Sequence, residues 1–246
     1  MKDKPEILFS MEQALSAVLA DLTSCPDVSA ILVFGSAQRG DVTRSSDIDL
    51  LVVTTGRKYW REGRIVCGVP VDFFFNPLPM LLQRLNQEDV VVVQGVATGD
   101  VLFDRHGMMP SVVSQARHVW ESGPSLITDW DRVLVRYRIG SLAQDLEDAT
   151  TPGPDTVLLA THLVTRALEA YLTLHRRWPV ATRRLLVAIE SLDVGLAKET
   201  REFYADVTNT ARAIRIADRV LEPFGGRTAE YRSPKAELPE GMTDTD

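Results

Sequence analysis

Residues 34–53 read FGSAQRGDVTRSSDIDLLVV. A Gly-Ser pair, Gly35 and Ser36, opens this stretch, and two acidic residues, Asp47 and Asp49, stand at the head of its apolar end. The apolar end predicts a strand. Because side chains two positions apart on a strand point to the same face, Asp47 and Asp49 are expected to project together.

This stretch offers groups for both a phosphate and a metal ion. Gly35 lets the backbone approach a ligand because it has no Cβ, and a helix beginning at Ser36 would present free N–H groups to an anion. Paired carboxylates suit Mg²⁺, which binds through one or two carboxylates plus substrate phosphates. A third carboxylate, Asp72, interrupts the apolar run at 69–75, where an unpaired charge is costly. Three acidic groups can hold two metal ions.

The order of these residues resembles the DNA polymerase β-like nucleotidyltransferase superfamily. The nearest resemblance is to its small bacterial members, the kanamycin-nucleotidyltransferase-like enzymes and the minimal nucleotidyltransferases, and the specific match covers residues 31–76. The resemblance implies triphosphate contacts and two bound Mg²⁺ ions. The positions that it assigns are Gly35 and Ser36 for the triphosphate, Asp47 and Asp49 for both metals, and Asp72 for the catalytic metal.

Three arginines are further candidates for phosphate contacts. Arg39 and Arg44 flank the acidic pair and could meet the triphosphate, or they could be solvated loop residues. Arg183 stands in a segment where several relatives place phosphate-contacting residues, and the alternative is a surface position at a helix start. Residues 57–61, RKYWR, mix basic and aromatic side chains that could stack on a base, but the acidic chain favours an exposed approach to a hairpin.

The composition is that of a soluble globular protein. The chain has 246 residues, 45% of them hydrophobic and 25% charged, with a net charge of −7. This acidity argues against non-specific nucleic-acid binding. No uninterrupted apolar stretch reaches the roughly 18 residues of a membrane span, and no signal peptide opens the chain. Cys25 and Cys67 fit a reducing cytoplasm and are predicted to be buried.

The pattern of apolar residues predicts an α+β fold with two domains. Residues 1–122 are expected to form a nucleotidyltransferase domain around a small mixed, palm-like sheet. Within it we expect a helix capped by Ser10 with Gln13 and a hairpin turning at Gly68. The remaining elements are strands at 30–34 and 48–53, a helix at 81–87, and two segments, 90–93 and 101–104, that are ambiguous between strand and helix.

Residues 123–226 are expected to form a helical bundle, and the polar residues 227–246 a disordered tail. Thr128 and Asp131 predict a helix start. Opposite the apolar stripe of a later helix, four polar residues share one face and could line an acceptor cleft or face water: His162, Arg166, Glu169 and Thr173. Candidates for a general base are Asp145, Glu147, Asp148 and Glu169.

The resemblance implies Mg²⁺-dependent transfer of a nucleoside monophosphate, foremost AMP from ATP, to a hydroxyl group with release of pyrophosphate. The acceptor would be an aminoglycoside-like small molecule, or a side chain of a partner protein. The alternative from another class is a non-catalytic, antitoxin-like nucleotide-binding module that acts through a partner. Extension of a nucleic-acid 3′ end is a weaker option, because the composition gives no hint of a basic groove. We expect a cytoplasmic protein with no nucleic-acid or membrane partner.

Overall fold

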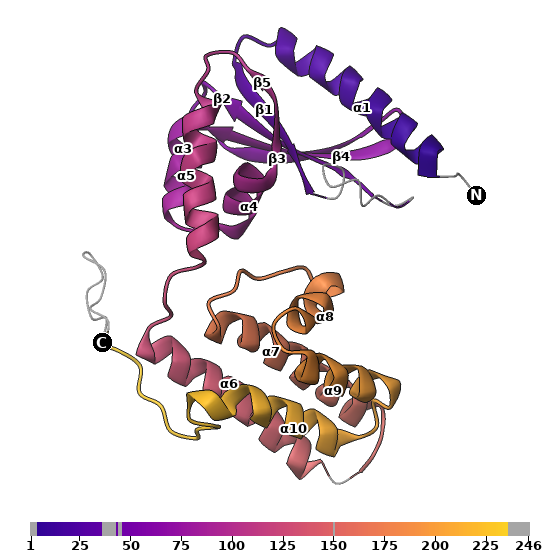
Figure 1. Cartoon of the computed structure of the whole chain (residues 1–246), viewed down its shortest axis with the longest axis vertical. Helices are drawn as coiled ribbons and strands as arrows, with labels where there is room; N and C mark the ends of the chain where they lie inside the picture. The colour runs from indigo at the N-terminus through magenta and orange to yellow at the C-terminus, as the bar shows by residue number, and fades with distance from the viewer. Residues whose placement is uncertain (1–3, 36–42, 44–45, 150, 236–246) are drawn as a thin grey trace, which may run out of the picture. The chain divides into compact units, whose positions relative to one another are not determined.

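The computed structural model describes residues 4–35, 43, 46–149 and 151–235. The chain divides into two compact units, Met1–Pro124 and Ser125–Asp246, and each is described by itself (Figure 1). The first unit combines a five-stranded sheet with helices, and the second contains only helices among its described residues. The predicted α+β fold class is therefore confirmed.

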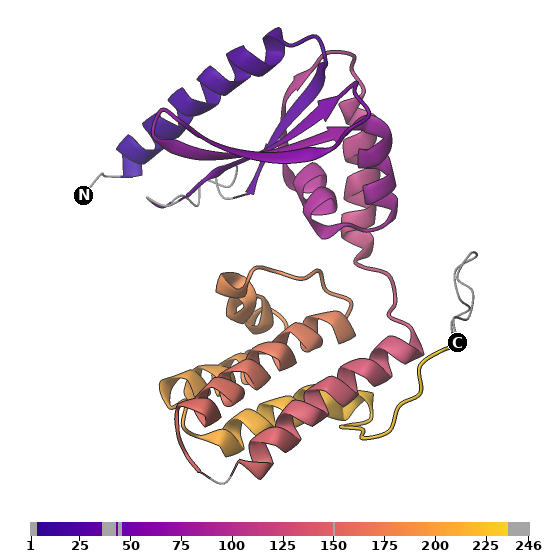
Figure 2. The ribbon, with the colours of Figure 1, turned by 180° about the vertical axis from the view of Figure 1, so that it is seen from behind.

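The first unit is a mixed sheet with helices against both faces. The strand order is β3-β4-β2-β1-β5, in which β2 and β4 are parallel and the other neighbours antiparallel. Helix α1 covers one face, and α3, α4 and α5 lie on the other (Figures 1 and 2). The elements are α1 Lys4–Ser24, β1 Val28–Phe34, β2 Ile48–Thr54, β3 Trp60–Val66, β4 Val69–Pro77, α3 Leu78–Asn86, α4 Val90–Thr98, β5 Asp100–Asp104 and α5 Met109–Ser122.

Strand β2 separates two faces with different chemistry. Its residues Ile48, Leu50 and Val52 pack into one apolar cluster with the buried side of α1. Because side chains alternate along a strand, Asp49 and the residues two and four positions after it lie on the opposite face. The acidic end of β2 therefore belongs to the face without α1.

A tight turn joins β3 to β4 at the predicted position. Cys67 and Gly68 have φ values of 50° and 78°, as the type I′ hairpin turn requires. The turn pairs Val66 with Val69 and so brings Gly63 opposite Asp72. The position of Cys67 in this turn explains why it is exposed.

Two local predictions need correction, and one open alternative is resolved. Cys25 and Cys67 are both exposed and not buried, since each lies in a connection between elements. Ser10 lies inside α1, where its hydroxyl donates to the carbonyl of Glu6, so the predicted cap is wrong. The ambiguous segment 90–93 is helical because Asp89 caps α4, accepting from two backbone N–H groups, whereas 101–104 is strand.

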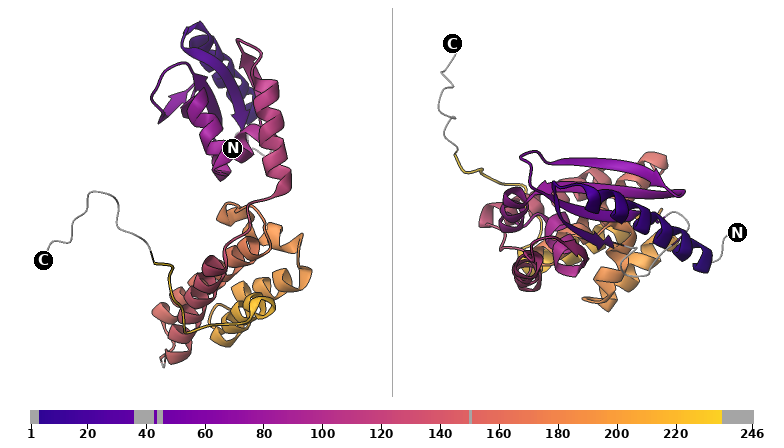
Figure 3. Two further views of the ribbon diagram at one scale, coloured as in Figure 1. Left: turned by 90° about the vertical axis from the view of Figure 1, so that its left-hand side faces the viewer. Right: turned by 90° about the horizontal axis from the view of Figure 1, so that it is seen from above.

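The second unit is built around one stripe of buried residues on helix α7. The capping box of Thr128 and Asp131 at the start of α6 is present, with an Asp131 N–H to Thr128 Oγ1 distance of 3.0 Å. Figure 3 gives two further views of the helices. They are α6 Asp129–Asp148, α7 Pro154–Leu174, α8 Thr182–Glu190, α9 Val194–Ala205, α10 Thr210–Leu221 and the short 3₁₀ helix η1 Glu222–Phe224.

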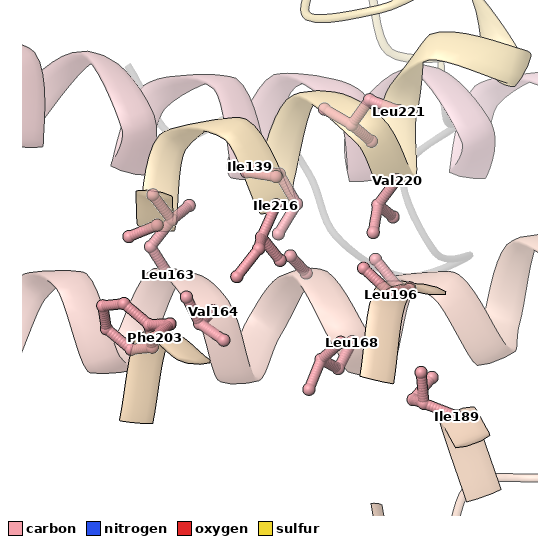
Figure 4. Packing of buried hydrophobic residues seen from close by; sticks show 14 of the residues in the cluster. Ile139, Leu163, Val164, Leu168, Ile189, Leu196, Phe203, Ile216, Val220 and Leu221 are labelled. Atoms are coloured by element: carbon pink, nitrogen blue, oxygen red, sulfur yellow. The ribbon is translucent and has the colours of Figure 1, made fainter. Parts of the chain in front are cut away.

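The apolar stripe predicted on α7 forms the centre of this core. Leu163, Val164 and Leu168 of α7 pack with residues from α6, α8, α9 and α10 (Figure 4). By length and composition alone, α7 is long and apolar enough to cross a membrane, which the sequence analysis did not predict. A helix that contributes many residues to a protein core has the same apolar composition, and α7 contributes many residues to the core of the second unit.

The first residues of the predicted disordered tail make contacts with the second unit. Arg227 pairs with Asp218 at 2.6 Å and with Glu147 at 2.8 Å. These two carboxylates raise the pKa of the Arg227 guanidinium, the hydrogen bond to Asp218 contributing most. Tyr231 packs against Tyr137, with 4.3 Å between the ring centroids.

The side chain of Asp193 caps α9 and links it to α10. Its carboxylate accepts from the Leu196 N–H at 2.8 Å and pairs with Arg219 at 2.9 Å. We expect Asp193→Ala to lower the free energy of unfolding by about 1–2 kcal/mol, through loss of a helix cap and a partly exposed ion pair. Asp193→Asn keeps the cap and should cost less than about 1 kcal/mol. Urea unfolding of the two variants checks this, and equal losses would contradict the assignment of the cap.

The Asp193 carboxylate also makes the free energy of unfolding depend on pH. Partial burial raises the pKa of Asp193, but the Leu196 N–H and Arg219 together outweigh it, so the pKa lies below its usual value. A depressed pKa contributes stability that is present at neutral pH and is lost as the pH falls through the pKa of the folded state. The stability difference between the wild-type chain and Asp193→Asn should therefore shrink below about pH 4.

Candidate active site

Three acidic side chains meet where β2 begins and beside it on β4. Asp49 and Asp72 are opposite each other in the parallel β2–β4 register, and Asp47 stands two residues before Asp49. One carboxylate oxygen from each of the three lies within 4.8 Å of the others, and all three residues are half-buried. The structure thus brings together the three residues that the sequence assigned to metal binding. Hard oxygen donors at this spacing fit one or two divalent cations.

Two glycines leave room for these carboxylates. Gly35 follows β1 with a φ of 79°, and a Cβ built on it would lie 2.3 Å from Asp49 Oδ2. A Cβ on Gly63 would lie 3.2 Å from Asp72 Oδ1. Gly35 was singled out from the sequence as a place of close approach to a ligand, whereas the structure shows it in close approach to Asp49. Gly63 was not predicted, although the two-residue turn at 67–68 fixes its pairing with Asp72.

A basic residue that the sequence did not assign faces Asp72. The guanidinium of Arg61, on β3, pairs with Asp72 Oδ2 at 2.5 Å and lies 4.5 Å from the centroid of the Phe74 ring. The side chains of Arg61 and Asp72 are 61% and 29% exposed. Residues 57–61 were expected to be an exposed approach to a hairpin, but Trp60 and Arg61 are the first residues of β3. Arg61 therefore competes with any metal ion for this carboxylate.

Removing this competitor should strengthen cation binding. In the nucleotide-free protein we expect Arg61→Gln to bind Mn²⁺ about two- to fivefold more tightly, because an exposed ion pair is worth about 0.2–1 kcal/mol. Arg64→Gln is the matched control, since Arg64 pairs with Glu62 and Asp21 and not with the acidic triad. Electron paramagnetic resonance of free Mn²⁺ measures both. An unchanged or weaker affinity in Arg61→Gln would show that Arg61 does not oppose the metal.

The structure does not test the other predicted phosphate contacts. Ser36, Arg39 and Arg44 lie outside the described residues. Arg183 is exposed near the start of α8 in the second unit, and its phosphate contact stays a prediction. The structure thus places Gly35 and the acidic triad together and leaves the four other positions untested.

The second unit contains a surface cavity of about 580 Å³ among α6, α7 and α8. His162, Arg166, Glu169 and Thr173 line it, so this polar face of α7 borders a cavity. Of the candidate bases, Glu169 pairs with Arg166 at 2.6 Å and Glu147 with Arg227 at 2.8 Å. Asp148 accepts from Gln144. Nothing in these contacts singles out one carboxylate as a base.

Comparisons with known proteins agree with this geometry. Residues 13–93 match the family model described as a nucleotidyltransferase domain. These residues include β1, β2, β3 and β4, and with them Gly35 and all three acidic residues. No curated protein is significantly similar to the chain.

A comparison with solved structures gives a match at low sequence identity. It is described as a nucleotidyltransferase-like protein from Exiguobacterium sibiricum 255-15, with 16% sequence identity and a TM-score of 0.48. The match covers 87% of this chain and 75% of that one. The family match rests on the segment that holds the acidic triad, so residues 13–93 are similar to a nucleotidyltransferase domain.

Proposed function

We propose that the chain transfers AMP from ATP to a hydroxyl group of a small molecule, releasing pyrophosphate, in a reaction that depends on Mg²⁺. The observation that carries the proposal is the cluster of Asp47, Asp49 and Asp72 within 4.8 Å, inside a segment that matches a nucleotidyltransferase domain. The match to a nucleotidyltransferase domain supports generic transfer of a nucleoside monophosphate. The choice of ATP, Mg²⁺ and a small acceptor is our proposal.

The donor set fits the metal that the proposal needs. Asp47 and Asp49 would hold two Mg²⁺ ions and Asp72 one of them, since hard carboxylate oxygens are the ligands that Mg²⁺ takes in nucleotide sites. When bound, the ions neutralise charge on the triphosphate and make the acceptor hydroxyl easier to deprotonate. The chain's own part is to hold the carboxylates side by side, with Gly35 leaving space for Asp49.

The second unit contains a cavity large enough for a small molecule. Its volume of about 580 Å³ lies in the range of pockets for drug-sized molecules. Its lining includes Arg138, Arg166 and Glu169, and Glu169 is already paired with Arg166. Because it offers one acidic group, the acceptors tested should include neutral and anionic hydroxyl compounds as well as aminoglycosides.

The test is pyrophosphate release from ATP, GTP, CTP and UTP with Mg²⁺. The acceptor panel holds aminoglycosides, lincosamides, neutral and anionic alcohols, and cell lysate. Acceptor-dependent release that is lost in Asp47→Asn/Asp49→Asn would support the proposal, and the responding compound would give the acceptor class. Release only with lysate protein would favour a protein side chain as acceptor. Binding of nucleotide with no release above the double variant would favour a non-catalytic module.

A further inference from the structure

The first unit also contains a cavity, which lies on the face of the sheet that α1 covers. Its volume is about 550 Å³, within the range of small-molecule pockets. The end of α1, the end of β2 and the start of β3 supply its walls, among them Leu22, Thr54 and Trp60. None of the acidic triad lines it.

This cavity is separate from the candidate active site in face and in position. Asp49 and Thr54 are five positions apart on β2, so their side chains lie on opposite faces of the sheet. Five residues of strand span roughly 17 Å. A small molecule in the cavity would therefore touch neither the triad nor a nucleotide bound to it.

One wall is a stack of aromatic rings. Trp60 lies on Phe75 with 4.2 Å between ring centroids and an angle of 9° between the planes, and both residues line the cavity. Trp60 stays 43% exposed. Aromatic groups pack well in offset stacks, so a planar ring is the shape that would extend this wall.

Two basic side chains at the cavity, Arg57 and Lys58, form no ion pair with a described residue, whereas two of its three acidic side chains are paired with Arg64. Arg64 pairs with Glu62 at 2.5 Å and with Asp21 at 3.5 Å. The pKa of Glu62 is lowered, chiefly by its hydrogen bond from Arg64.

Asp27, which also lines the cavity, accepts a hydrogen bond from the Thr55 hydroxyl at 3.1 Å. Arg57 and Lys58 are exposed and line the cavity. Neither forms an ion pair or hydrogen bond with any residue that the structure describes. A carboxylate, sulfonate or phosphate would find two available cations here.

We propose that this cavity binds a planar aromatic molecule with one anionic group. Its ring packs against Trp60, and its anionic group faces Arg57 and Lys58. The site is distinct from the proposed transferase site, and its occupation does not depend on nucleotidyl transfer.

The two exposed cysteines provide a direct test in the full-length chain. Cys25 lines the cavity and Cys67 does not. In Cys67→Ser, alkylation by iodoacetamide reports on Cys25, and in Cys25→Ser it reports on Cys67. We expect naphthalene-2-sulfonate to slow alkylation of Cys25 saturably, about tenfold at ten times the half-saturating concentration. The rate at Cys67 should not change. Neutral naphthalene-2-methanol should need about tenfold more for the same effect, since it lacks the charge.

Substitution of Arg57 and Lys58 tests whether their positive charges bind the anionic group of the ligand. In the Cys67→Ser background, Arg57→Gln/Lys58→Gln should raise the half-saturating concentration at least about tenfold, whereas Arg138→Gln/Arg201→Gln, which removes two cations of the second unit, should leave it unchanged. Protection that does not saturate, that is equal at Cys67, or that survives in Arg57→Gln/Lys58→Gln would overturn the proposal.

Discussion

Asp49→Asn is expected to reduce nucleotidyl transfer on the order of 10²–10³-fold, the range for loss of a preorganised electrostatic group. Asp49 stands between Gly35 and Asp72 and shares a cluster with Asp47. Asparagine keeps the shape but offers one neutral oxygen where the carboxylate offers two charged ones, so it is a poor ligand for a hard cation. The affinity for Mn²⁺ should fall together with kcat/KM.

The stability of this variant should move in the other direction. Three carboxylates within 4.8 Å repel one another, and removing one charge relieves that repulsion. Differential scanning calorimetry without divalent metal should give a Tm equal to or above that of the wild-type chain. Asp100→Asn is the matched control, because Asp100 is an exposed acidic residue at the start of β5 outside the triad. Activity of Asp49→Asn within about threefold of this control would remove the triad from the mechanism.

Gly35→Ala is expected to lower activity by displacing the Asp49 carboxylate. The new Cβ would lie 2.3 Å from Asp49 Oδ2, so the carboxylate or the backbone must move. A displacement of about 1 Å at a catalytic group can cost on the order of 10²-fold in rate. The φ of 79° adds roughly 1–2 kcal/mol of backbone strain for a residue with a Cβ.

Gly68→Ala separates the two effects. Gly68 has nearly the same φ, 78°, but nothing lies within 4 Å of a Cβ built there. Both variants should lower the free energy of unfolding by roughly 1–2 kcal/mol, measured by urea unfolding. Only Gly35→Ala should lose kcat/KM. If the two variants lose activity alike, backbone strain and not contact with Asp49 explains the effect.

The acidic triad could be predicted from the sequence because two simple rules place it. Alternation along a strand puts Asp47 and Asp49 on the same face. Asp72 is a lone acidic residue in an apolar strand, where its charge is costly unless it is paired or binds a metal ion. The resemblance to a known family added the roles. The parallel pairing that sets Asp49 opposite Asp72 is a matter of sheet topology, and local pattern does not fix it.

What the sequence did not decide depends mostly on contacts that are distant in sequence. Arg61 was read as a loop residue because nothing nearby shows that it lies at the start of an edge strand beside Asp72. The sequence left open whether His162 and Arg166 line a cleft or face water, since that depends on packing between α6, α7 and α8. The segment from Val90 is different, because its four consecutive valines have neither helical nor strand periodicity and the adjacent cap at Asp89 makes it a helix.

The ion pair between Arg61 and Asp72 changes what metal loading means for the proposed transferase. A guanidinium already balances one of the three negative charges, so loading is an exchange of one cation for another. The metal-free chain then keeps part of its charge balance, and the concentration of Mg²⁺ needed for half-maximal activity includes the cost of releasing Arg61. A nucleotide, whose phosphates offer the displaced guanidinium a new partner, would lower that cost and make binding of metal and nucleotide mutually dependent.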